Sequence, residues 1–317
     1  MGSEMCIRDR HRRGQANSVP GVTIVGPEQL RELEPHCAGI EALHVPSSGI
    51  IDYREVAEKL GELLEPCSCA IHRKTGVHGV RHEKDGLILQ TNRGDFPVRY
   101  MISCAGLHSD RVARMEGSKL DIRIVPFRGE YYELVPDRCN LVRTLIYPVP
   151  DPRFPFLGVH FTKRLNGSIE AGPNAVLALS REGYRKTQVG VRDLANVMTY
   201  PGFWRLATKF WRTGMEEMAR SFNKNAFVRA LQRLVPEIRS EELGTGGAGI
   251  RAQALRTTGE MVDDFVIVDR PRALHVCNAP SPAATASLSI AMEIVSRAAK
   301  SFDLGTPKEF DSDTDWL

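Results

Sequence analysis

The stretch that most limits how this chain can fold is NAPSPAATASLSIAMEIVSRA, residues 278–298, together with the apolar run before it. Residues 273–277 are typical of a buried strand, residues 281–285 form a turn of small residues, and a long helix follows. Small residues let a ligand approach the backbone, and the first N–H groups of a helix favour negative charge. The pattern predicts a ligand-binding turn, and an ordinary strand-to-helix connection is the alternative.

Composition excludes several classes of protein. The chain is 42% hydrophobic and 26% charged, and its 42 basic and 39 acidic residues are scattered, so neither disorder nor nucleic-acid binding is expected. We find no apolar run of bilayer length and no secretion signal, and therefore expect a cytoplasmic protein. The seven cysteines are widely spaced, and the pair Cys67 and Cys69 lacks zinc-site spacing, so we expect reduced thiols and no metal.

Residues 1–13 differ from the remainder because they are polar, basic toward their end, and show neither periodicity nor a cap. We expect them to be a non-native leader and leave them out of the fold. Residues 14–119 have the pattern of an α/β domain. The predicted elements are a helix over 27–35, a strand over 40–45, a helix over 52–65 with Asp52 as its cap, strands over 76–90 with a turn at 84–86, a strand over 98–103 and a helix over 109–115.

Residues 120–244 contain many short strands and then helices. Strands over 122–125, 130–135, 144–149, 156–161 and 168–171 predict an antiparallel sheet. Residues 193–235 predict two or three helices, and we interpret their aromatic residues Phe203, Trp204, Phe210 and Trp211 as core. Strands resume from residue 249, so we expect residues 245–317 to join residues 14–119 in one domain and residues 120–244 to form another. The fold class is therefore α/β (α+β).

Gly244 to Gly249 match G-x-G-x-x-G, the dinucleotide fingerprint, but the context is wrong. That fingerprint works between a buried strand and the helix it opens, and here a charged segment precedes it and a turn follows within a few residues. We therefore expect a flexible loop beside a ligand. The alternating residues after it place Arg251 and Gln253 on one face of a strand, where they could hold a carboxylate, and a surface ion pair is the alternative.

Other candidate residues are individually ambiguous. His160 lies in an apolar strand, where a single histidine is more often a core residue than a base. Arg128, Lys163 and Arg164 could supply positive charge for an acidic substrate. We find no nucleophile elbow, zinc motif or paired-carboxylate arrangement.

Six segments, taken together and in order, resemble the L-2-hydroxyglutarate dehydrogenases, which belong to the D-amino-acid oxidase-like flavoproteins. The resemblance covers roughly residues 21–299. The segments are VPSSGIIDYREVA (45–57), ISCAGLHSDRVARM (102–115), VPFRGEYYEL (125–134), the stretch from IYPVP to NAVLA (146–178), GAGIRAQAL (247–255) and NAPSPAATASL (278–288).

The resemblance implies a two-domain FAD enzyme, with a Rossmann-like domain built from both chain ends and a substrate domain whose mixed or antiparallel sheet covers the flavin. It implies cofactor contacts near the pyrimidine end of the flavin at Ser281, Pro282, Ala283, Ala284 and Thr285. Further cofactor contacts are implied at Cys104, Ala105 and Gly106, near the pyrophosphate, and at Gly249.

The resemblance also implies substrate residues. Arg251 would hold the C1 carboxylate, and His160 with Tyr147 would lie on the sheet facing the flavin. Oxidation of a 2-hydroxy acid sends the Cα hydride to flavin N5 while a base removes the hydroxyl proton, so we expect His160 to be the base. The distal carboxylate would meet Lys163, Arg164 or Arg128. The electron acceptor would be a quinone, a carrier protein or oxygen. A quinone acceptor would suit peripheral contact with the inner membrane, although no amphipathic basic helix is evident in the sequence.

One departure from the family concerns its first strand, G-x-G-x-x-G and helix, which have no counterpart before residue 45, although a βαβ unit needs roughly 30 residues. We therefore expect an N-terminally truncated member that lacks its first βαβ unit, binds FAD poorly and has little activity. The alternatives are a related flavin oxidase of another 2-hydroxy or 2-amino acid and an inactive, non-catalytic fragment.

Overall fold

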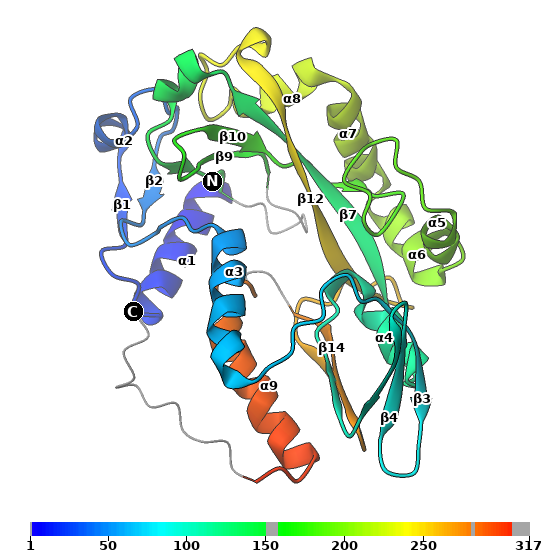
Figure 1. Cartoon of the computed structure of the whole chain (residues 1–317). Coiled ribbons are helices and arrows are strands. Elements are labelled where there is room, and N and C mark those ends of the chain that lie inside the picture. The colour runs from blue at the N-terminus through cyan, green and yellow to red at the C-terminus, as the bar shows by residue number, and fades with distance from the viewer. Residues whose placement is uncertain (1, 150–157, 280–282, 306–317) are drawn as a thin grey trace.

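The structure is a computed structural model that describes residues 2–149, 158–279 and 283–305. A long twisted sheet crosses the upper part of the molecule, with helices along one side of it and smaller sheets below (Figure 1). Its two longest strands, β7 (Ile122–Leu134) and β12 (Leu243–Arg256), form an antiparallel central pair to which the shorter strands are added. On the other edge of β7 lie β10 (Ile169–Gly172) and β11 (Val176–Leu177), and β9 (His160–Lys163) and β8 (Leu145–Ile146) extend the sheet beyond β10. The predicted antiparallel sheet is confirmed.

Two predictions about the central pair are wrong. Residues 122–135 do not form two short strands, because β7 is continuous through Pro126 and Gly129. Residues 244–249 are not a loop, because they lie within β12, which has a bulge between Thr245 and Ala248. A Cβ on Gly246 would lie 2.5 Å from the carbonyl oxygen of Tyr131, so that glycine permits close strand approach. The strand also confirms that these glycines are no dinucleotide fingerprint.

A second group of strands lies in the lower part of the molecule (Figure 1). In one sheet, β14 (Ala273–Asn278) is antiparallel to β13 (Val266–Arg270) and parallel to β6 (Met101–Ser103). The other sheet has the order β3 (Val77–His82), β4 (Leu87–Thr91) and β5 (Gly94–Val98). The buried strand predicted at 273–277 is confirmed, whereas the one predicted at 98–103 is divided between the end of β5 and β6.

Helices surround the sheets. α3 (Tyr53–Leu64) begins where predicted, because the Asp52 side chain accepts a hydrogen bond from the backbone N–H of Arg54 at 2.8 Å. α2 (Pro27–Leu33), β2 (Ala42–His44) and α4 (Ser109–Met115) also match their predicted positions. α9 (Ser287–Ser301) is the predicted long helix, which starts two residues after Thr285.

Residues 2–16 form a helix, α1 (Gly2–Ala16), although the sequence analysis expected no element there. It is rich in residues with good helix propensity, and its Ile7 is buried. α1 contacts β2 and β1 (Thr23–Val25). That residues 1–13 are non-native stays a prediction.

Between residues 190 and 232 the structure has α5 (Val191–Met198), α6 (Pro201–Lys209), α7 (Trp211–Phe222) and α8 (Lys224–Leu231), more helices than predicted. Phe203 and Phe210 pack partly buried against the core, as interpreted. The core interpretation is wrong for Trp204 and Trp211, whose side chains are 52% and 59% exposed. Trp204 instead donates from Nε1 to the Met198 carbonyl oxygen at 2.8 Å, and Trp211 lines an apolar pocket beside α6.

A buried ion pair joins the two expected domains. Arg181, which follows β11, donates to the Asp110 carboxylate of α4 at 3.0 Å, and Arg114 donates to it at 2.9 Å. Burial alone would raise the pKa of Asp110, but the Arg181 guanidinium and further donors hold it below its ordinary value. β12 crosses the boundary expected at residue 244, and the domain division itself stays a prediction.

We expect the substitution Arg181→Met to lower the free energy of unfolding by about 3 kcal/mol or more at neutral pH, because it leaves a buried carboxylate without its main partner. Since the pKa of Asp110 is lowered, the pair stabilises the fold fully above the unfolded value of about 3.9, and its contribution disappears as the pH falls through the lowered value. The loss should therefore shrink in acid. Urea unfolding of both proteins at several pH values measures it.

The control is Arg297→Met, which breaks a partly exposed pair with Asp269 and should cost less than about 1 kcal/mol. Equal losses for the two variants would contradict the assignment of Arg181 and Asp110 as a buried structural pair.

Candidate active site

The strand register brings two of the predicted site residues, His160 and Arg251, to one face of the large sheet. Directly opposite residues share a face, and residues two apart on a strand do too. His160 is opposite Gly172, Thr162 is opposite Glu170, and Glu170 is opposite Glu133. On β7, Tyr131 lies two residues before Glu133, and Phe127 lies four residues before Tyr131. Phe127 is opposite Arg251 of β12. We call the face carrying His160, Thr162, Glu170, Tyr131 and Arg251 the site face.

The opposite face is core. It carries Phe161, Ile169 and Leu134, which pack against Phe227 and Leu231 of α8. The side chains of Tyr131, His160 and Thr162 on the site face are only partly buried. Nearer Arg251 the site face is also covered, because Val125, Phe127 and Leu177 pack against residues of α5 and α6. A face of this kind can cover a ligand.

His160 is held in a defined orientation. Its Nδ1 lies 3.1 Å from the Gly158 carbonyl oxygen, and its ring stacks on Tyr147 with centroids 4.1 Å apart. Because a carbonyl can only accept, Nδ1 carries the hydrogen and the lone pair of the neutral ring is on Nε2. Burial lowers the pKa of His160, and the Gly158 carbonyl only partly opposes this decrease. The neutral, proton-accepting form is therefore favoured at neutral pH.

Arg251 extends from β12 with a solvent-exposed side chain. Partial burial of the guanidinium lowers the pKa of Arg251, and the nearby Asp263 carboxylate opposes the decrease. An arginine remains charged under these conditions. A partly desolvated cation attracts a carboxylate more strongly than one in bulk water.

The three other predicted cations differ in availability. Arg128 is buried on the core face and donates to Glu130 at 2.8 and 3.1 Å. Lys163 is opposite Ile169, which places it on the core side of an exposed strand end. Arg164 follows His160 and Thr162 on the site face and forms an ion pair with Glu170. The geometry therefore brings Arg164 to the site face, and it brings neither Arg128 nor Lys163 there.

Tyr131 was missed by the sequence analysis. It is partly buried on the site face, and burial and then the Glu170 charge raise its pKa, so the hydroxyl stays protonated and can donate. Alternation along VPFRGEYYEL could have placed Tyr131 with Phe127 on one face, but only the register with β10 and β12 shows what else shares that face.

One of the predicted cofactor turns lies at an edge of the smaller sheet. Because β6 and β14 are parallel and Ser103 is opposite His275, Cys104, Ala105 and Gly106 follow the carboxyl end of β6 beside the last residues of β14. Ligands of open α/β sheets bind at such an edge. Gly106 has φ +50°, and a Cβ there would meet open space. The Ser109 hydroxyl donates to the Cys277 carbonyl at 2.8 Å and fixes α4 on β14.

The turn before α9 is only partly described. Ala283, Ala284 and Thr285 form a turn that leads to the N-cap residue Ala286, which has no side-chain acceptor for the first N–H groups of α9. Ser281 and Pro282 lie outside the described residues. Gly249 lies on the site face, where an added Cβ would meet nothing within 4 Å. These open backbone positions fit a large planar cofactor between the sheet face and the carboxyl edge.

Neither a metal-binding cluster nor a membrane-spanning helix is found among the described residues. Within residues 2–149, 158–279 and 283–305, no cluster of histidine, cysteine and carboxylate side chains has a metal-binding arrangement. Over the same ranges, no helix has both the length and the hydropathy needed to span a bilayer.

Comparison with known proteins identifies the family. Residues 3–297 match the family model of the FAD dependent oxidoreductases. An L-2-hydroxyglutarate dehydrogenase of Indibacter alkaliphilus is 49% identical over 92% of this chain and 73% of its own length. The human mitochondrial L-2-hydroxyglutarate dehydrogenase is 39% identical over 93% of this chain and 67% of its own length.

Solved structures support the fold. The dithionite-reduced L-α-glycerophosphate oxidase of Mycoplasma pneumoniae with FAD bound superimposes with a TM-score of 0.72 at 19% identity, covering 92% of this chain and 69% of the oxidase. Together these comparisons confirm the family resemblance and the FAD-binding fold class inferred from the sequence motifs. This chain belongs to the FAD-dependent oxidoreductases, and within them to the family of the L-2-hydroxyglutarate dehydrogenases.

Proposed function

We propose that, contrary to the weak FAD binding expected from the sequence, this protein binds FAD and oxidises L-2-hydroxyglutarate to 2-oxoglutarate, using Arg251 to hold the substrate and His160 as the base. The observation that carries the proposal is the strand register, which puts Arg251 and His160 on the same face of the sheet. Relatives between 39% and 49% identical bear the name of this activity, which supports the choice of substrate.

Arg251 provides binding and orientation. Its guanidinium can donate two parallel hydrogen bonds to the C1 carboxylate, and such a bidentate pair fixes both the position and the rotation of the adjacent Cα. Bound FAD supplies the acceptor for the hydride that leaves Cα. The contribution of Arg251 is to keep that carbon where transfer can occur.

His160 provides the proton acceptor. Its Nε2 lone pair can take the proton of the 2-hydroxyl group as the carbonyl forms, and the stacked Tyr147 ring keeps the imidazole in place. The Tyr147 hydroxyl lies 3.4 Å from Thr162 Oγ1, which restrains the tyrosine in turn. For the distal carboxylate, the position of Arg164 on the site face supports it over Arg128 and Lys163.

The proposed electron acceptor is a quinone or a carrier protein. The relatives are named dehydrogenases, which supports a quinone or a carrier protein over oxygen. A related flavin oxidase acting on another 2-hydroxy or 2-amino acid is the second candidate, because changing the hydroxyl to an amine alters one contact. Substrate-dependent bleaching of the flavin, with and without oxygen, distinguishes them.

Replacing Arg251 should impair substrate use. We expect Arg251→Ala to lower kcat/KM for L-2-hydroxyglutarate by about 10²-fold or more, because the Cα is no longer held, and Arg251→Lys to recover only part. Steady-state kinetics with an artificial electron acceptor measure this. Arg256→Ala on the same strand, which breaks a surface pair with Asp121, is the control. Unchanged kinetics in Arg251→Ala would refute the assignment.

Protonation of His160 should cause kcat/KM to fall at acidic pH. In the wild type we expect kcat/KM to fall as the pH drops through the lowered pKa of His160, below about 6.5, because the protonated ring cannot accept a proton. His160→Asn should lower the rate of flavin reduction by about 10²- to 10⁴-fold and flatten that limb. Stopped-flow flavin reduction across pH measures both, with the exposed His78→Asn as control. An unaltered acidic limb in His160→Asn would exclude it as the base.

Gly249 tests where the flavin lies. A leucine there has room on the site face, so we expect Gly249→Leu to keep its thermal unfolding midpoint but to lose most of its bound flavin. The flavin-to-protein absorbance ratio of the purified variant measures this. Gly76→Leu, which also places a side chain in open space but precedes β3, is the matched control. Full flavin content in Gly249→Leu would move the cofactor away from this face.

A further inference from the structure

The outer face of α7 carries an apolar stripe that the described residues leave uncovered. Trp211, Met215, Met218 and Phe222 are spaced by four, three and four residues, which places them along one side of the helix. Their side chains are 59%, 65%, 43% and 75% exposed. Exposed apolar groups are ordinary when scattered, but a continuous stripe of large ones marks an interaction surface.

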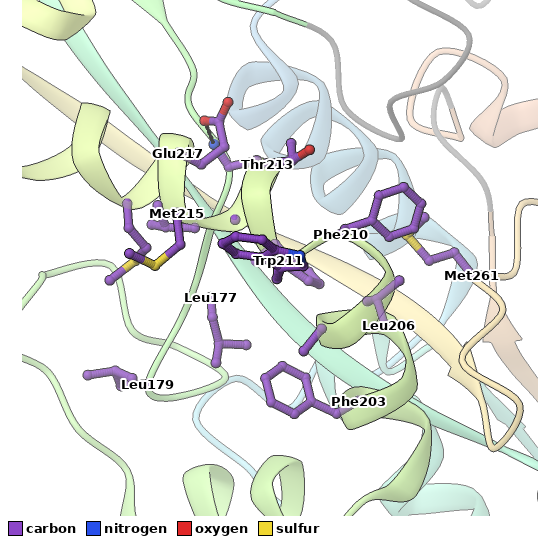
Figure 2. Close-up of a pocket in the computed structure, with 16 residues that line it drawn as sticks. Leu177, Leu179, Phe203, Leu206, Phe210, Trp211, Thr213, Met215, Glu217 and Met261 are labelled. Atoms are coloured by element: carbon purple, nitrogen blue, oxygen red, sulfur yellow. Dashed lines mark hydrogen bonds between the residues drawn. The ribbon is translucent and has the colours of Figure 1, made fainter.

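An apolar pocket opens beside this stripe. Its volume is about 510 Å³, and three stripe residues, Trp211, Met215 and Met218, also line it. Figure 2 shows the Trp211 ring between the side chains of α6 and those of α7, with Leu177 and Leu179 opposite. The one carboxylate among its described lining residues, Glu217, is already bonded to the Ala175 N–H at 3.0 Å and paired with Arg220. The pocket therefore suits a hydrocarbon chain better than a polar ligand.

Cations border the stripe. Arg212 lies 5.3 Å from the ring centroid of Trp211, Lys209 lies 5.2 Å from that of Phe210, and Lys186 lies 5.6 Å from that of Phe222. Glu217 is paired with Arg220, and Glu216 is also within ion-pair distance of that arginine. Lysine and arginine next to exposed tryptophan, phenylalanine and methionine form the pattern of helices that lie in the membrane interface.

We propose that the α7 stripe, with its bordering cations, docks this protein onto an anionic lipid bilayer, and that the adjacent pocket takes a hydrocarbon chain from it. The sequence analysis found no amphipathic helix of this kind because it assigned the aromatic residues of this region to the core. The helix has 12 residues, too few to cross a bilayer but enough to lie in its surface. The proposal goes beyond the oxidation reaction and depends on no step of it.

Vesicle flotation with the full chain tests the docking. We expect the wild type to float with vesicles of phosphatidylcholine and phosphatidylglycerol in equal amounts, and to bind pure phosphatidylcholine less well. Met215→Glu with Phe222→Glu should weaken binding about tenfold or more, because two charges replace inserted side chains. Lys209→Glu with Arg212→Glu should weaken binding to anionic vesicles by about fivefold or more per cation at low salt. Ile40→Glu, which replaces an exposed side chain outside α6 and α7, is the control.

A second measurement uses the unaltered stripe. The chain has three tryptophans, so Trp204→Phe with Trp316→Phe leaves Trp211 as the only one. We expect its emission to shift to the blue with anionic vesicles and to be quenched by lipids brominated on their acyl chains, because the ring enters the hydrocarbon boundary.

Three results would overturn the proposal. They are absence of binding to either vesicle type, equal binding of the Met215→Glu/Phe222→Glu protein and the wild type, and Trp211 emission that brominated lipids leave unchanged. Sedimentation that shows a dimer abolished by the same two substitutions, without vesicle binding, would assign the stripe to a second copy instead. None of these measurements uses turnover, so their outcome is separate from that of the proposed reaction.

Discussion

The pairing of β7 with β12 is the interaction on which the other features depend. The two strands stay in register from Ile122 opposite Arg256 to Glu130 opposite Ala248, and they pair again after the bulge. This ladder joins segments more than a hundred residues apart, and it orients both faces of the sheet at once. One face packs on α8, while the other presents Arg251 and Tyr131. A slip of one residue would exchange those faces, so the buried face fixes the position of the site residues.

Charge on the two faces is arranged according to burial. On the core face, Glu130 is surrounded by Arg128, Asn174 and Ser221, and burial, which would raise its pKa, is outweighed by these donors, which lower it. Such a network satisfies its own members and has little capacity left for a ligand. On the site face, the desolvation of the partly buried His160 and Tyr131 is not outweighed by hydrogen bonds or charges. Burial therefore lowers the pKa of the one and raises that of the other, leaving both neutral.

The sequence predicted those parts of the fold that local rules determine. Asp52 as a helix cap, the turn before β4 and the strand that becomes β14 depend on neighbouring residues, and the structure has them where expected. The glycines at 244–249 were misjudged because their role depends on Tyr131, which is over a hundred residues away. Likewise, alternation could place Arg251 on a face of its own strand, but only pairing through β7 and β10 relates that face to His160. Arg128 was wrongly included among the candidates for a similar reason. Its ion pair with Glu130 keeps it from a substrate only because the fold buries both side chains.

The sequence correctly indicated an apolar side on the helices α6 and α7, but it wrongly predicted that their tryptophans are buried. Helical periodicity in FWRLATKFW indicates an apolar side, and composition favours placing it in the core. The structure instead divides the aromatics: Phe203 and Phe210 pack against the cluster that contains Leu206 and Val125, whereas Trp204 and Trp211 are more than half exposed. Phe127 lines the resulting pocket and lies directly opposite Arg251. The apolar surface and the proposed substrate residue are therefore held by the same strand pair, and a shift in either strand would move both.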